Sequence, residues 1–168
     1  MDRAISLFVR AITIDPSYAT AWSALGGALY LKGQFLGMRE LAQKAMQHLR
    51  RAIELHPGLA NAHVWLGGVL LQLGEIDQGI AELKIAQELE PENPDVHQTL
   101  ARALWLFRGM VPEGIGELRR SIALNPEGGY SHLQLSMLEA LSGNLDEAEV
   151  AARHAIELQE RAMSGTEG

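Results

Sequence analysis

The sequence predicts an all-α fold, a right-handed superhelical solenoid of antiparallel helix hairpins. Three observations predict it: a short segment recurs along the chain, the apolar residues of each copy fall at helical spacing, and no useful length of chain alternates as a strand would. Of the 168 residues, 47% are hydrophobic and 21% are charged. This composition is typical of a soluble globular protein and excludes intrinsic disorder.

The recurring segment closes with a proline at Pro16, Pro57, Pro91 and Pro126, and a fifth copy at 155–160 lacks the proline. The proline intervals are 41, 34 and 35 residues, so the period is about 34 residues with insertions of seven and one. We therefore expect a single array over 1–168 with one half repeat and four full repeats. The expected boundaries are 2–15 for the half repeat and 19–59, 60–93, 94–128 and 129–162 for the full repeats.

Each period contains two apolar runs at offsets that place them on one helical face. The first run of one repeat reads His63, Leu66, Gly67 and Leu70. The second run carries small residues, which let two helices approach closely. Between the runs, glycines stand where a helix end needs a left-handed residue: Gly33, Gly74 and Gly143. Each period is therefore predicted to be a helical hairpin whose second helix ends at the proline.

These positions resemble the tetratricopeptide repeat family, whose pattern is a Trp, Leu-Gly, Tyr helix followed by an Ala, Phe, Ala, Pro helix. Two positions depart from it. Histidine replaces the tryptophan at His63, His97 and His132. The tyrosine slot holds Leu29, Leu70, Leu104 and Glu139.

The resemblance implies a non-catalytic module that binds a peptide or helix of a partner protein in a concave groove. By alignment with the family, the partner-binding residues are Tyr30, Val64, Leu71, Gln98, Arg102, Trp105, Leu133 and Met137. Trp105 is the expected hot spot, with Arg102 oriented toward a carboxylate or carbonyl of the ligand. Two alternatives stay open: Trp105 packs against an adjacent helix, or the array is a structural, self-assembling segment that spaces or regulates a larger enzyme or regulator.

Charge and composition narrow the partners. The formal charge of −7 provides no field for phosphate backbones, so nucleic acid is not expected. Residues 1–58 carry a net charge of +3 and residues 59–168 a net charge of −10. The absence of Cys removes thiolate and disulfide chemistry. No HExxH, GxSxG, P-loop or GxGxxG motif occurs, so we expect no enzyme activity, no catalytic residue and no cofactor.

The three equivalent histidines, His63, His97 and His132, suggest a row of metal ligands. Packed helix axes lie roughly 8–10 Å apart, whereas metal ligation needs ring nitrogens about 2.0–2.1 Å from one ion. We therefore expect no metal site. The favoured interpretation is an aromatic-sized filler that is hydrogen-bonded at the start of each first helix.

The seven-residue insertion falls between Gly33 and Ala45. It amounts to almost two helical turns, so a helix lengthened by it keeps its packing face in phase. We expect a protruding extension whose apolar residues either pack on a neighbouring helix or meet a partner. These residues are Phe35, Leu36, Met38 and Leu41.

The longest uncharged stretch, 55–74, contains Pro57 and four glycines, so we expect no membrane insertion. No secretory signal opens the chain, and we expect a soluble, cytoplasmic protein. The chain begins on a half repeat and ends at 164–168 without a polar capping helix. We therefore expect a fragment of a longer protein, whose uncovered ends favour association with a second copy.

Overall fold

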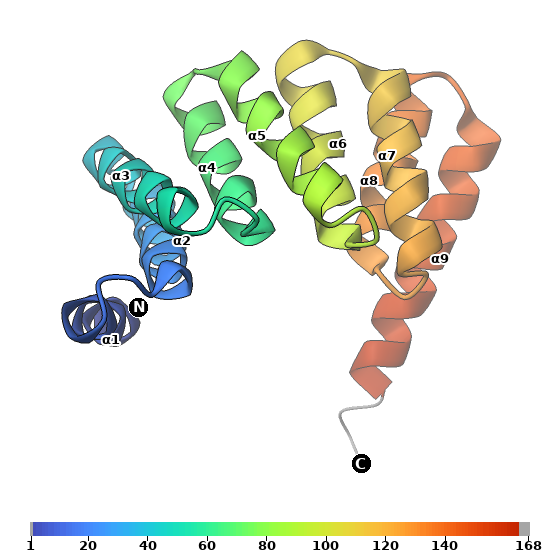
Figure 1. Ribbon diagram of the computed structural model, residues 1–168. Coiled ribbons are helices and arrows are strands. Elements are labelled where there is room, and N and C mark those ends of the chain that lie inside the picture. The colour runs from blue at the N-terminus through green and yellow to red at the C-terminus, as the bar shows by residue number, and fades with distance from the viewer. Residues whose placement is uncertain (1, 165–168) are drawn as a thin grey trace. The chain divides into compact units, whose positions relative to one another are not determined.

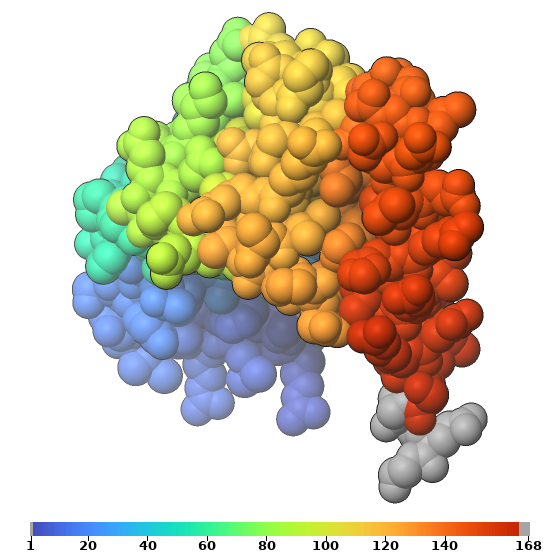
Figure 2. All heavy atoms as spheres, turned by 90° about the vertical axis from the view of Figure 1, so that its right-hand side faces the viewer, coloured from blue at the N-terminus to red at the C-terminus, as the bar shows by residue number. Residues whose placement is uncertain are grey.

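The computed structural model describes residues 2–164, and within this range it forms nine α-helices and no strand. The helices are α1 (Asp2–Ile14), α2 (Ala19–Leu36), α3 (Arg39–Leu55), α4 (Ala60–Leu73), α5 (Ile76–Leu89), α6 (Pro94–Arg108), α7 (Val111–Leu124), α8 (Gly129–Leu141) and α9 (Leu145–Ser164). Consecutive helices pair as antiparallel hairpins, which confirms the predicted all-α class (Figure 1). Figure 2 shows α9, a helix of 20 residues, along its length beside α8.

The helices divide between two compact units, Met1–Pro91 and Glu92–Gly168. The first unit holds α1 and the hairpins α2/α3 and α4/α5, and the second holds the hairpins α6/α7 and α8/α9. The tail residues 165–168, on which the expectation of an uncapped end partly rests, lie outside the described residues. No helix in the described range is long and apolar enough to cross a membrane.

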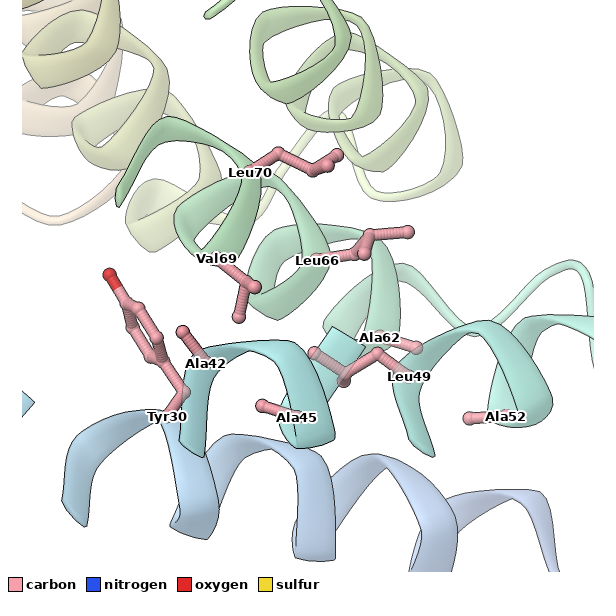
Figure 3. Packing of buried hydrophobic residues seen from close by; sticks show 9 residues of the cluster. All are labelled: Tyr30, Ala42, Ala45, Leu49, Ala52, Ala62, Leu66, Val69 and Leu70. Carbon is pink, nitrogen blue, oxygen red and sulfur yellow. The ribbon is translucent and has the colours of Figure 1, made fainter. Parts of the chain in front are cut away.

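The core of the first unit forms where α3 packs between α2 and α4 (Figure 3). Leu49 of α3 and Leu66 of α4 are buried there, and each such side chain contributes about 1.5–3 kcal/mol by leaving water. The small residues of α3 fill the gaps between them. They are Ala42, Ala45 and Ala52, each fully buried.

Glycine allows α4 and α5 to approach closely, as the small-residue pattern predicts. A Cβ added to Gly67 would lie 2.9 Å from the carbonyl oxygen of Gly79. A Cβ added to Gly79 would lie 3.0 Å from the carbonyl oxygen of Gly67. Real Cβ atoms need more room than this, so both glycines are required by packing rather than by a turn.

The predicted role of Gly33 as a helix end is wrong. Gly33 is buried inside α2, and the left-handed residue is Gly37, with φ 67°. The reason is that α2 has 18 residues against 14 in α4, and α3 has 17 against 14 in α5. The insertion thus adds about one turn to each helix of the hairpin and moves the connection to Gly37.

The extension is partly packed and partly exposed. Leu41 is half-buried, and its Cβ would lie 3.0 Å from a Cβ added to Gly33. Phe35 is 84% exposed, and Leu36 and Met38 are also exposed. Of the two alternatives for these residues, packing on a neighbouring helix therefore describes Leu41 alone.

In the second unit, Leu118 of α7 and Leu138 of α8 are fully buried against Ala101 of α6. Trp105 and Leu135 pack against this cluster from its edge. The cluster therefore joins α6, α7 and α8.

Candidate functional site

The predicted groove residues of the second unit lie on α6 and α8. These two helices are joined by a hydrogen bond of 2.7 Å, which Gln98 Nε2 donates to Ser131 Oγ. Beside it, Leu133 is 56% exposed and Met137 is 42% exposed. Arg102 is exposed as well. Arg102 on α6 and the apolar side chains of Leu133 and Met137 on α8 are therefore all accessible.

Trp105 differs from these residues because it is only half-exposed and packs on the core cluster. Its Nε1 is buried without a hydrogen-bond partner, and so is Oε1 of Gln134. By repeat position, Trp105 is equivalent to Tyr30 and Gln134 is equivalent to Trp65. In the first unit the rings of Tyr30 and Trp65 meet edge-on, with centroids 6.0 Å apart.

The predicted groove residues of the first unit are less accessible. Tyr30 and Leu71 are each 8% exposed, and Val64 is half-buried. Tyr30 covers Gly68, since a Cβ added there would lie 3.1 Å from Tyr30 Oη. In this unit the aromatic residues thus fill their own surface, whereas the second unit leaves Leu133 and Met137 uncovered.

The histidines are hydrogen-bonded fillers, as the sequence predicts. Nε2 of His63 donates to the carbonyl of Pro57 and Nε2 of His132 to the carbonyl of Pro126, each over 3.0 Å. The indole of Trp22 makes the same contact with the carbonyl of Pro16, over 2.9 Å. Within the described residues, no group of three or more His, Asp or Glu side chains could hold a metal ion.

Two of these histidines also contact a carboxylate on the following helix. Nδ1 of His63 lies 2.6 Å from Glu82 Oε2, and Nδ1 of His97 lies 2.7 Å from Glu117 Oε2. At the equivalent position of α9 the chain has Ala151. His132 therefore lacks this carboxylate, and its ring instead contacts the ring of His154, with centroids 5.0 Å apart.

A pocket of about 450 Å³ opens at this point of the second unit. It is formed by three helices: Arg119 and Ile122 of α7, His132, Leu135 and Glu139 of α8, and Asp146, Glu147, Val150, Ala151 and His154 of α9. Most of its wall is apolar. The pocket lies on the face of α8 that carries His132 and Glu139, not on the face that carries Leu133 and Met137.

Glu139 is a buried carboxylate at the wall of this pocket, 1% exposed. Its Oε1 accepts a hydrogen bond of 2.8 Å from Arg119 Nη2, and its Oε2 accepts one of 2.7 Å from Asn144 Nδ2. The equivalent positions, Leu70 and Leu104, hold buried leucines. The repeat pattern places Glu139 in the tyrosine slot but does not by itself predict the pocket. The available signal was the interval of 19 or 20 residues from histidine to glutamate, which leads from His132 to alanine.

Comparison with known proteins supports the repeat fold. Residues 39–103 match the family model of the tetratricopeptide repeat. This chain carries tetratricopeptide repeats. A curated relative, the ALBINO3-like protein 3, mitochondrial, of Arabidopsis thaliana, is 30% identical over 136 residues, which is 74% of this chain. The chain spans about a quarter, 24%, of that protein's length.

Solved tetratricopeptide repeat structures share the fold. The crystal structure of MamA matches with a TM-score of 0.76 at 20% identity, covering 97% of this chain and 91% of that one. YrrB, described as a TPR protein with an unusual peptide-binding site, matches with a TM-score of 0.69 at 21% identity, covering 96% and 79%. These identities are low, so the likeness establishes the fold alone.

Proposed function

We propose that this repeat array is a non-catalytic interaction module that binds a peptide or helix of a partner protein, without a cofactor. The observation that carries the proposal is the exposure of Leu133 and Met137 on α8 and of Arg102 on α6, two helices joined by the hydrogen bond from Gln98 to Ser131. Aromatic residues, methionine and arginine are enriched at protein interfaces. An apolar side chain of the ligand would contact Met137, and Arg102 would bind its carboxylate or a backbone carbonyl.

The first unit provides a second and smaller surface in this proposal. Tyr30, Val64 and Leu71 line it, and they are already largely covered by their own chain. We therefore expect these three residues to contribute little binding energy and to act mainly through the shape of the surface. YrrB is described as having a peptide-binding site, which supports protein recognition as the general function but does not indicate a particular ligand.

The test selects ligands from a displayed library of random peptides and then measures their affinity for variants of the chain. Met137→Ala and Leu133→Ala should each weaken a selected peptide by roughly 1–2 kcal/mol, because both side chains lose contact area at the interface. Ile156→Ala is the matched control, since Ile156 is an exposed aliphatic residue on α9, away from this face.

The expected result is weaker binding for the two face variants and unchanged binding for the control. A selected peptide that binds all four proteins equally would remove this face from the proposal. Unfolding curves for each variant separate lost binding from lost structure.

A second candidate is association between copies of this chain. The whole of α1 lacks a buried residue, and Leu7 and Ile14 are exposed on it. On α9, Val150 and Met163 are exposed as well. The net charges of +3 over residues 1–58 and −10 over residues 59–168 favour head-to-tail contact at low salt. Light scattering at rising concentration tests this, and a strict monomer at high concentration and low salt would contradict it.

A further inference from the structure

We infer that the pocket between α7, α8 and α9 binds a small amphiphilic carboxylate, whose anionic oxygen contacts Nδ1 of His132. This site is separate from the proposed peptide surface, because His132 and Glu139 lie on a different face of α8 from Leu133 and Met137. The inference therefore does not depend on the proposed function.

The repeat itself indicates the ligand's polar group. In two earlier repeats a carboxylate contacts the equivalent atom, Glu82 at 2.6 Å from His63 and Glu117 at 2.7 Å from His97. In the last repeat Ala151 removes that carboxylate. Nδ1 of His132 has no hydrogen-bond partner among the described residues, although the side chain is only 7% exposed. His132 lines the pocket, so a ligand atom held there can provide the hydrogen-bond partner that Nδ1 lacks.

The chemistry of the ring agrees with an anionic ligand. A carbonyl oxygen only accepts, so Nε2 of His132 must carry a proton in its contact with Pro126. With a second proton on Nδ1, the ring donates to a carboxylate through a charge-assisted hydrogen bond. The same pair of acceptors, a carbonyl and a carboxylate, surrounds the ring of His63.

The rest of the pocket indicates the ligand's body. Its volume of about 450 Å³ lies within the range of about 300–1,000 Å³ that small-molecule sites occupy. Aliphatic side chains from all three helices line it: Ile122, Leu135 and Val150. These surfaces suit a short hydrocarbon chain or ring attached to the carboxylate.

The charges around the pocket must also be compatible with an anion. Glu139 is bound by Arg119 and Asn144, so its charge is already neutralised. Asp146 and Glu147 are exposed, and their repulsion is therefore screened by solvent. Arg119 lines the pocket as well, so the pair of Arg119 and Glu139 adds no net charge to its wall.

The experiment titrates the whole chain with three probes of equal length, octanoate, octanol and octylammonium, and follows amide and imidazole NMR shifts. Octanoate is expected to bind most tightly and to shift the signals of His132 and His154. Octanol isolates the contribution of the apolar body. If octylammonium binds there more tightly than octanoate, or if octanoate produces no shift, the inference is overturned.

Two pairs of variants locate the site. Ala151→Glu restores the carboxylate of the other repeats and should weaken octanoate by at least about tenfold, whereas Gln159→Glu adds the same charge elsewhere on α9. Val150→Trp fills the pocket from its exposed rim and should also abolish binding, whereas Ile156→Trp lies outside the lining. Equal octanoate affinity in a folded Val150→Trp or Ala151→Glu variant and its control would overturn the inference.

Discussion

Nδ1 of His63 lies 2.6 Å from the carboxylate oxygen Oε2 of Glu82, and the pair joins the start of α4 to α5 within one hairpin. His97 and Glu117 repeat the contact between α6 and α7. In each pair the ring is buried and the carboxylate is half-buried. Each pair therefore links the two helices of a hairpin. The histidine of the pair stands where the family pattern has an uncharged tryptophan.

Glu82→Gln should destabilise the first unit by roughly 1–3 kcal/mol, because the buried ring of His63 loses a charged acceptor. Glu88→Gln is the control, since Glu88 is exposed on the same helix. Urea unfolding of both variants measures the difference. Equal stability of the two variants would show that the His63–Glu82 contact contributes nothing net.

Gly67→Ala should cost roughly 1–3 kcal/mol, because the added methyl group overlaps the backbone of Gly79 and α4 must move away from α5. Gly116→Ala should have the opposite sign. Gly116 lies inside α7 with open space around its Cβ position, so alanine should stabilise the helix by about 0.5–1 kcal/mol. Thermal unfolding of both variants checks the sign, and a stabilised Gly67→Ala variant would contradict the close approach.

The hairpins could be predicted from the sequence because their apolar period and their prolines are local features. The end of α2 could not, since Gly33 and Gly37 are both glycines near the expected turn. One serves a close approach to Leu41 and the other a positive φ. The insertion lengthens both α2 and α3, and only the resulting helix lengths decide which of the two glycines ends α2.

The predicted partner-binding residues differ in their exposure between the two units. Leu133 and Met137 are exposed on the expected face, whereas Tyr30 and Leu71 belong to the same aligned stripe and are buried. The burial of Tyr30 arises from a neighbouring side chain, since Trp65 packs on it in the first unit. Alignment to a repeat pattern gives the direction of a side chain but not what covers it.

His48 should make the first unit less stable in acid. Partial burial against Trp22 lowers the pKa of His48 below its ordinary value of about 6.5, because burial disfavours the charged ring. The unfolded chain then binds a proton more readily than the folded one. Stability from this source is therefore complete above pH about 6.5 and falls as the pH drops below that value.

His48→Gln should flatten the decline in stability between neutral pH and about pH 5. His56→Gln serves as the comparison, since His56 is exposed in the connection after α3. Urea midpoints at several pH values measure the slope. A slope that is the same in wild type and His48→Gln would show that this ring does not control it.

Gln134→Met should stabilise the second unit by roughly 0.5–2 kcal/mol. The carbonyl of Gln134 is buried without a partner, and methionine has a similar length without the cost of an unpaired acceptor. Gln159→Met, on the exposed side of α9, is the control and should leave stability unchanged. A less stable Gln134→Met variant would mean that the amide is hydrogen-bonded in solution.

Trp105→Ala distinguishes the two roles that the sequence left open for this residue. Trp105 packs on Leu118 and Leu138, so its loss should cost roughly 2–4 kcal/mol of folding stability. Under the anchor interpretation the variant keeps its stability and instead loses roughly 2–4 kcal/mol of peptide affinity. Unfolding and affinity to a selected peptide are measured on the same sample. Because Met137 is exposed and Trp105 is tied to the core, we expect Met137→Ala to change mainly affinity and Trp105→Ala mainly stability.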